Sequence, residues 1–126
     1  MRKTLNLTKE QIAEYRSTAL LLQQQERKKV VKRQLLGWKA AQQAAKLLKK
    51  NFGAQRVALF GSMVHDGCFT RWSDVDIAAW GIPPHNTFRA VVAVMGISQD
   101  IKINLVDVET CSPSLLSVIE QEGKEL

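Results

Sequence analysis

The first fifty residues constrain the fold of this chain most strongly, because they contain no proline and few residues that disfavour a helix. The segment from residue 8 to residue 50 is rich in Ala, Leu, Gln, Glu, Lys and Arg. Thr8 and Gln11 have the spacing of a capping box, and Lys49-Lys50 suit the last turn of a helix. Only Gly37 interrupts the segment, so the sequence predicts either one long helix or two helices hinged near residues 36–38.

The pattern changes to short strands after residue 53. Residues 56–60 form an apolar run that leads into Gly-Ser, and residues 74–80 and 101–106 alternate as strands do. Helical patterns occupy 88–95 and 112–119, and the segment from 63 to 72 should begin as a helical turn and continue as a loop. We therefore predict an α/β fold of the α+β kind, a small mixed sheet with flanking helices, preceded by a long helical N-terminal extension.

The length of 126 residues and the hydrophobic fraction of 45% fit one ordinary domain with its own core. Global disorder and a collagen-like chain are excluded. No apolar run approaches the ~20 residues of a membrane span, and residues 1–7 are too polar for a secretory signal. Cys68 and Cys111 form neither a disulfide framework nor a metal motif. We expect a cytoplasmic protein with a helical extension at 1–50 and a second domain at 51–126.

The net charge of +6 comes entirely from the helical extension. Residues 1–50 hold 13 Lys/Arg and 3 Glu, a balance of +10, whereas residues 51–126 hold 5 Lys/Arg and 9 Asp/Glu, a balance of −4. The basic cluster at residues 27–33 is most simply a solvated helix face. Contact with RNA or with an acidic partner is the less favoured alternative.

The residues that suggest chemistry are Gly61-Ser62 and, about a dozen positions later, Asp74 and Asp76. Alternate residues of a strand share a face, so the two carboxylates should lie together. Close carboxylates repel each other unless a cation lies between them, and Mg²⁺ prefers such oxygen ligands. A strand that ends in Gly-Ser offers backbone N–H groups and a hydroxyl to a phosphate. Together these features predict phosphoryl or nucleotidyl transfer.

Two segments, Leu59–Ser62 (LFGS) and Trp72–Ile77 (WSDVDI), resemble the signature of the minimal nucleotidyltransferases of the polymerase-β-like superfamily. The resemblance covers residues 51–126 and implies a polymerase-β-like nucleotidyltransferase fold there. Members of this family often serve as antitoxins of small helical ribonucleases of the HEPN type. They silence the toxin by transferring AMP from ATP to a tyrosine hydroxyl near its active site.

The same resemblance implies the roles of individual residues. Gly61, Ser62 and Ser73 would bind the nucleotide, while Asp74 and Asp76 would hold Mg²⁺ and act in catalysis. The chain would then be a Mg²⁺-dependent protein adenylyltransferase with ATP as co-substrate and a HEPN-type toxin as partner.

The sequence departs from the family pattern at two places. The position of the third catalytic carboxylate is Asn104, whose amide can coordinate a metal but cannot accept a proton. Asp107 could replace it only if a bulge changed its orientation, since alternation directs it to the opposite face. His65 and Asp66 stand where the family usually has arginine and glycine, and His65 is expected to be a loop residue rather than a metal ligand. We predict that Asn104 faces the site and that transfer of AMP is impaired.

Other interpretations remain open from the sequence. The chain could be a catalytically inactive module that neutralises its partner by stoichiometric binding. Asn104, in place of a carboxylate, is the reason for this alternative. An enzyme that adds nucleotides to RNA or to an aminoglycoside is less favoured, because the chain is too small to carry a recognition domain. Structurally, the two acids could be an exposed strand edge, and Gly61-Ser62 a simple turn. The number of AMP units, the metal count, the oligomeric state and the origin of Asn104 are not determined by these patterns.

Overall fold

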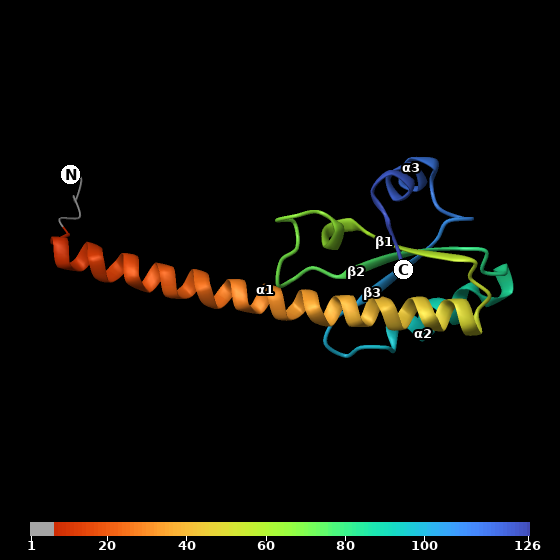
Figure 1. Ribbon diagram of the computed structural model, residues 1–126, viewed down its shortest axis with the longest axis horizontal. Helices are drawn as coiled ribbons and strands as arrows, with labels where there is room; N and C mark the ends of the chain where they lie inside the picture. The colour runs from red at the N-terminus through yellow and green to blue at the C-terminus, as the bar shows by residue number, and fades with distance from the viewer. Residues whose placement is uncertain (1–6) are drawn as a thin grey trace, which may run out of the picture.

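A single helix, α1 (Lys9–Asn51), is the longest element of the computed structural model, which describes residues 7–126 (Figure 1). The Thr8 hydroxyl accepts a hydrogen bond from the Gln11 backbone N–H at 3.1 Å, and Gln11 Oε1 accepts one from the Thr8 N–H at 2.9 Å. The predicted capping box is confirmed. Residues 1–6, part of the segment for which no secretory signal is expected, lie outside the described residues.

Helix α1 continues through Gly37 without a break, so of the two predicted arrangements the single helix is correct. Gly37 is buried, and a Cβ atom there would lie 2.9 Å from Met63 Sδ and 3.2 Å from Val75 Cγ2. Both distances are too short for ordinary packing. The missing side chain therefore allows the helix to approach the sheet and is not a hinge.

The sheet has four strands in the order β3-β2-β1-β4. Strand β1 pairs antiparallel with β2 and β4, whereas β2 and β3 are parallel. The elements after α1 are β1 (Arg56–Phe60), the 3₁₀ helix η1 (Gly61–Val64), β2 (Val75–Trp80), the 3₁₀ helix η2 (Pro84–Asn86), α2 (Thr87–Met95), β3 (Ile103–Asp107), α3 (Pro113–Glu122) and β4 (Lys124–Glu125). The predicted mixed α/β architecture is confirmed. Strand β4 was not predicted, because two residues are too few to show alternation.

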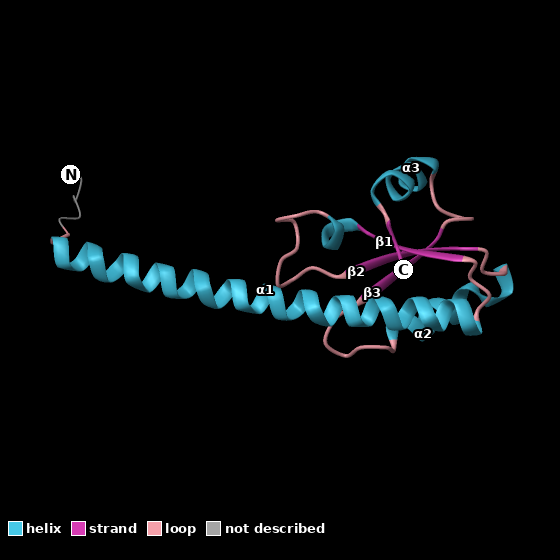
Figure 2. Cartoon of the chain, viewed as in Figure 1, coloured by secondary structure: helices cyan, strands magenta, loops and turns pink. Residues whose placement is uncertain are grey.

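Helices cover both faces of the sheet, with α1 and α2 on one face and α3 on the other (Figure 2). Alternating strand residues divide between the two layers. Leu59 and Ile77 are fully buried in the core that α1 and α2 share, whereas Phe60 and Ala78 pack with Ile119 of α3. Asp76, on β2, therefore belongs to a sheet that is packed on both faces.

The second half of α1 forms part of this core. Its buried residues are small except for one leucine, and they are Gly37, Ala40, Ala41, Ala44, Ala45 and Leu48. Packing thus crosses the boundary predicted at residue 50, and the division into 1–50 and 51–126 stays a prediction. The first half of α1 extends away from the sheet (Figure 1), and its residues Leu20, Leu21 and Leu22 are exposed. None of the helices within residues 7–126 is both long and apolar enough to cross a bilayer.

Arg56, at the start of β1, connects the C-terminal elements to the sheet. Its guanidinium lies 4.0 Å above the Trp80 ring, pairs with Glu120 of α3 at 3.4 Å, and forms a hydrogen bond with Glu125 of β4. The hydrogen bond to Glu125 raises the pKa of Arg56. These exposed contacts help to position β4 and α3 at the edge of the sheet.

Replacing Leu48 by alanine tests whether α1 belongs to the core of the domain. Leu48→Ala removes a fully buried side chain and should lower the free energy of unfolding by about 2–5 kcal/mol. The matched control Leu21→Ala, on the exposed part of the same helix, should change it by no more than about 0.5 kcal/mol. Urea unfolding followed by tryptophan fluorescence measures both, and equal effects would contradict the shared core.

Candidate functional site

The site begins where β1 ends and the chain turns. Phe60, the last residue of β1, lies opposite Asp76 of β2. Gly61 follows with a backbone φ of +78°, a conformation that residues with a side chain rarely adopt. A Cβ atom on Gly61 would lie 2.6 Å from Asp76 Oδ2. Gly61 is thus required for two reasons, its backbone conformation and the close approach of the Asp76 carboxylate.

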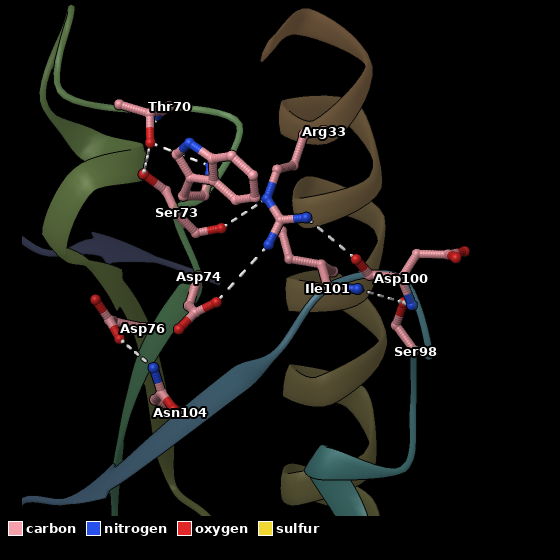
Figure 3. Close-up of polar contacts among 10 residues, drawn as sticks. Arg33, Thr70, Ser73, Asp74, Asp76, Ser98, Asp100, Ile101 and Asn104 are labelled. Carbon is pink, nitrogen blue, oxygen red and sulfur yellow. Dashed lines mark hydrogen bonds and ion pairs between the residues drawn. The ribbon is translucent and has the colours of Figure 1, made fainter. Parts of the chain in front are cut away.

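Asn104 lies on the other side of Asp76. The two residues are partners in the parallel ladder of β2 and β3. Asn104 Nδ2 donates a hydrogen bond to Asp76 Oδ1 at 3.0 Å (Figure 3). The structure therefore places Asn104 on the side of the sheet that the strand pattern predicts for it, next to a carboxylate.

Asp74 precedes the first residue of β2, so strand alternation does not determine its direction. Its Oδ1 atom lies 3.7 Å from Arg33 Nη2 of α1. Figure 3 shows Asp74 directed toward Arg33 and Asp76 directed toward Asn104. The two carboxylates are neighbours along the chain but have different partners.

The loop before Asp74 is held by its own side chains. Ser73 Oγ accepts a hydrogen bond from the Thr70 N–H at 2.9 Å and lies 3.3 Å from Thr70 Oγ1. The Trp72 N–H donates to Thr70 Oγ1 at 3.2 Å. The hydroxyl of Ser73, a predicted nucleotide ligand, is thus hydrogen-bonded within the turn. Ser62 differs, since its hydroxyl has no hydrogen-bond partner within residues 7–126.

Arg33 is the residue of the site that the sequence interpretation missed. The sequence predicts a solvated face for the basic cluster at 27–33, but Arg33 Nε donates to the Ser73 carbonyl at 2.8 Å and its Nη1 to the Asp100 carbonyl at 3.2 Å. A signal was available. Arg33 stands four residues before Gly37 and eight before Ala41, which places it on the stripe of α1 that faces the core.

Asp107 lies at the opposite end of β3. It is paired with Ala79 in the ladder, three residues beyond the Asp76–Asn104 pair, or about 10 Å along the strands. Its carboxylate accepts hydrogen bonds from Thr87 Oγ1 and from the Glu109 N–H, both at 3.1 Å. In this position Asp107 lies away from Asp76 and Asn104, and the register of β2 with β3 continues to Asp107 without a bulge.

His65 connects the loop after η1 to α3, because its Nε2 lies 2.8 Å from Glu122 Oε2. Within residues 7–126, no group of three or more His, Cys, Asp or Glu side chains lies close enough together to hold a metal ion. Asp74, Asp76 and Asn104 carry the oxygen atoms that the sequence predicts as Mg²⁺ ligands, and carboxylate and amide oxygens suit that ion. In this structure Asp74 faces Arg33, and Asp76 accepts a hydrogen bond from the Asn104 amide. A metal site shared by the three residues stays a prediction.

No family model matches the chain, and no curated protein matches it in sequence. Solved structures do resemble it. A mutant of the toxin–antitoxin complex MntA-HpeT is 27% identical, with 68% of this chain and 69% of that chain aligned at a TM-score of 0.55. A toxin–antitoxin complex with AMP-PNP is 28% identical, over 64% of this chain and 67% of that one, at a TM-score of 0.54.

A third neighbour supports the fold alone, since it is 24% identical. It is a complex of a tri-AMPylated HEPN toxin from Shewanella oneidensis with an MNT antitoxin, aligned over 71% of this chain and 70% of that chain at a TM-score of 0.52. The three alignments leave about a third of this chain uncovered.

Gly61 and Gly67 provide a matched pair for testing the site. Both have a positive φ, +78° and +77°, but a Cβ on Gly67 would meet nothing within 4 Å. Each alanine substitution should cost about 1–2 kcal/mol of stability from the backbone conformation. Only Gly61→Ala should also displace Asp76, and so shift the side-chain amide resonance of Asn104 in a ¹⁵N–¹H NMR spectrum. An equal shift in Gly67→Ala would contradict the contact between Gly61 and Asp76.

Proposed function

We infer that this chain is a member of the minimal nucleotidyltransferase antitoxin family, within the polymerase-β-like superfamily, and the partner of a HEPN-type toxin. We further propose that its site transfers AMP from ATP to a tyrosine hydroxyl of that toxin. The observation that carries the proposal is the contact of Gly61 with Asp76 at the end of two paired strands, with Asp74 two residues earlier. The neighbour with AMP-PNP supports a nucleotide site, and the neighbour with an AMPylated toxin supports the fold in which such transfer occurs.

Each residue of the site has a task in this proposal. The backbone N–H groups and free hydroxyl at Gly61-Ser62 would bind the phosphates of ATP. Asp74 and Asp76 would hold Mg²⁺, which when bound offsets the negative charge of the phosphates. The tyrosine oxygen would form a bond to the α-phosphorus while the bond to the β-phosphate oxygen breaks, so pyrophosphate leaves. The tyrosine proton has to go to a base.

Asn104 is where this chain is weak. An amide cannot accept the tyrosine proton. Its hydrogen bond to Asp76, at 3.0 Å, also satisfies that carboxylate with a neutral donor. Nucleotide binding should suffer less than chemistry, because Gly61, Ser62 and both aspartates are present.

Restoring the carboxylate tests the enzymatic proposal. Asn104→Asp should raise the rate of AMP transfer to a HEPN-type toxin by at least about 10²-fold, because general-base assistance is worth about 10² to 10⁴ in rate. Labelled ATP with Mg²⁺ and the purified toxin measures the transfer. Asn51→Asp, which makes the same chemical change at an exposed residue outside the site, should leave the rate unchanged. If the Asn104→Asp protein labels nothing, adenylyl transfer by this site is wrong.

A second candidate function, neutralisation by stoichiometric binding without chemistry, is favoured by the same hydrogen bond between Asn104 and Asp76. In that case the chain would inhibit the ribonuclease at a one-to-one ratio in the absence of ATP. The fold and the partner would be the same, and only the use of the site would differ.

Nucleotide binding distinguishes the two candidates. We expect Mg²⁺-dependent binding of AMP-PNP by calorimetry, and its loss in Asp74→Ala, because that change removes one of two carboxylate ligands. Asp66→Ala, which deletes an exposed carboxylate of the neighbouring loop, should bind as the unmodified chain does. No binding by the unmodified chain, together with inhibition of the toxin, would favour stoichiometric neutralisation.

A further inference from the structure

The guanidinium of Arg33, on α1, contacts both of the turns that precede the strands of the site. Nε donates to the Ser73 carbonyl at 2.8 Å, Nη1 donates to the Asp100 carbonyl at 3.2 Å, and Nη2 lies 3.7 Å from Asp74 Oδ1 (Figure 3). All three nitrogens are used. The side chain is largely buried, with 22% of its surface exposed.

These two turns begin the two strands that carry the site. The turn at 70–73 leads through Asp74 into β2, which carries Asp76, and the turn at 98–101 leads into β3, which carries Asn104. Ser98 Oγ holds the second turn by accepting hydrogen bonds from the N–H groups of Asp100 and Ile101, at 3.1 and 3.3 Å. Arg33 therefore joins α1 to both strands at the point where they enter the sheet.

The contacts indicate that geometry matters more here than charge. The ion pair to Asp74 is long at 3.7 Å and partly exposed, and such pairs contribute little to stability. The two hydrogen bonds to carbonyls are of ordinary length and need the fixed fork of a guanidinium. A lysine would keep the charge, but its single ammonium nitrogen could not span the three acceptors.

We propose that Arg33 is a positioning residue, which orients Asp74 relative to Asp76 by holding the turns before β2 and β3. The part of the proposal that concerns Mg²⁺ rests on the function proposed above. Partners that orient carboxylate ligands typically contribute about 10- to 100-fold to metal affinity. In this role Arg33 makes α1 one of the elements that hold the residues of the site in position.

The first test needs no nucleotide. Amide hydrogen exchange of residues 70–76 and 98–104 should be about tenfold faster in Arg33→Gln than in the unmodified chain, because two hydrogen bonds to these turns are lost. Arg33→Lys should be intermediate. The control Lys32→Gln removes the same charge from an exposed neighbour and should exchange as the unmodified chain does, and α3 should be unaffected in all variants.

The second test separates position from charge. The Mg²⁺ concentration for half-maximal AMP-PNP binding should rise about 10- to 100-fold in Arg33→Gln and rise also in Arg33→Lys, despite its retained charge. If charge alone mattered, Arg33→Lys would match the unmodified chain and Arg33→Gln would bind Mg²⁺ more tightly. That result would overturn the proposal.

The outcomes of the two tests are independent of each other. If the unmodified chain binds no AMP-PNP, the enzymatic function is wrong, and hydrogen exchange alone decides whether Arg33 positions the turns. Unchanged exchange in both Arg33 variants would overturn the positioning role even if nucleotide binds. Arg33→Lys keeps the tests decisive if Arg33→Gln does not fold.

Discussion

The close approach of α1 to the sheet is the constraint on which the rest of this structure depends. Glycine and alanine lie on one stripe of the helix, and a Cβ atom at Gly37 would lie only 2.9 Å from Met63 Sδ and 3.2 Å from Val75 Cγ2. Interiors pack at the density of crystals, so a larger side chain in this stripe would move the helix outward. At a greater distance Arg33 could not reach the carbonyls of Ser73 and Asp100. The geometry at Asp74 thus begins with small residues on α1.

Each carboxylate of the site has a polar partner of its own. Asp74 has the guanidinium of Arg33, and Asp76 has the amide of Asn104. A carboxylate in place of Asn104 would add a third negative charge next to Asp76 and increase the need for a cation. With an amide at position 104, the hydrogen bond from Asn104 holds Asp76 in position without a cation.

The first half of α1 stands in a different physical situation. Its leucines at 20–22 are exposed, so tertiary packing does not stabilise this segment, and its stability depends on helix propensity, on the capping box at Thr8 and on continuity with the packed half. Extending an existing helix is favourable in residues of this kind, whereas starting a helix is costly. The first half of α1 is thus stabilised by its covalent continuity with the second half, which packs in the core of the domain.

The types and order of the elements follow from the sequence by itself, because helix propensity, strand alternation and turn residues act over a few positions. The long helix, the first three strands, and the Gly-Ser and Asp-x-Asp segments could be recognised in this way, and so could the orientation of Asn104, since alternation determines which face it takes. Only the tertiary structure decided that Gly37 is a packing contact, that β4 adds a strand, and that Arg33 supports the site. The contacts of Arg33 span 40 and 67 residues, and that of Asn104 with Asp76 spans 28. Such contacts depend on how the helices pack on the sheet, which local patterns do not encode.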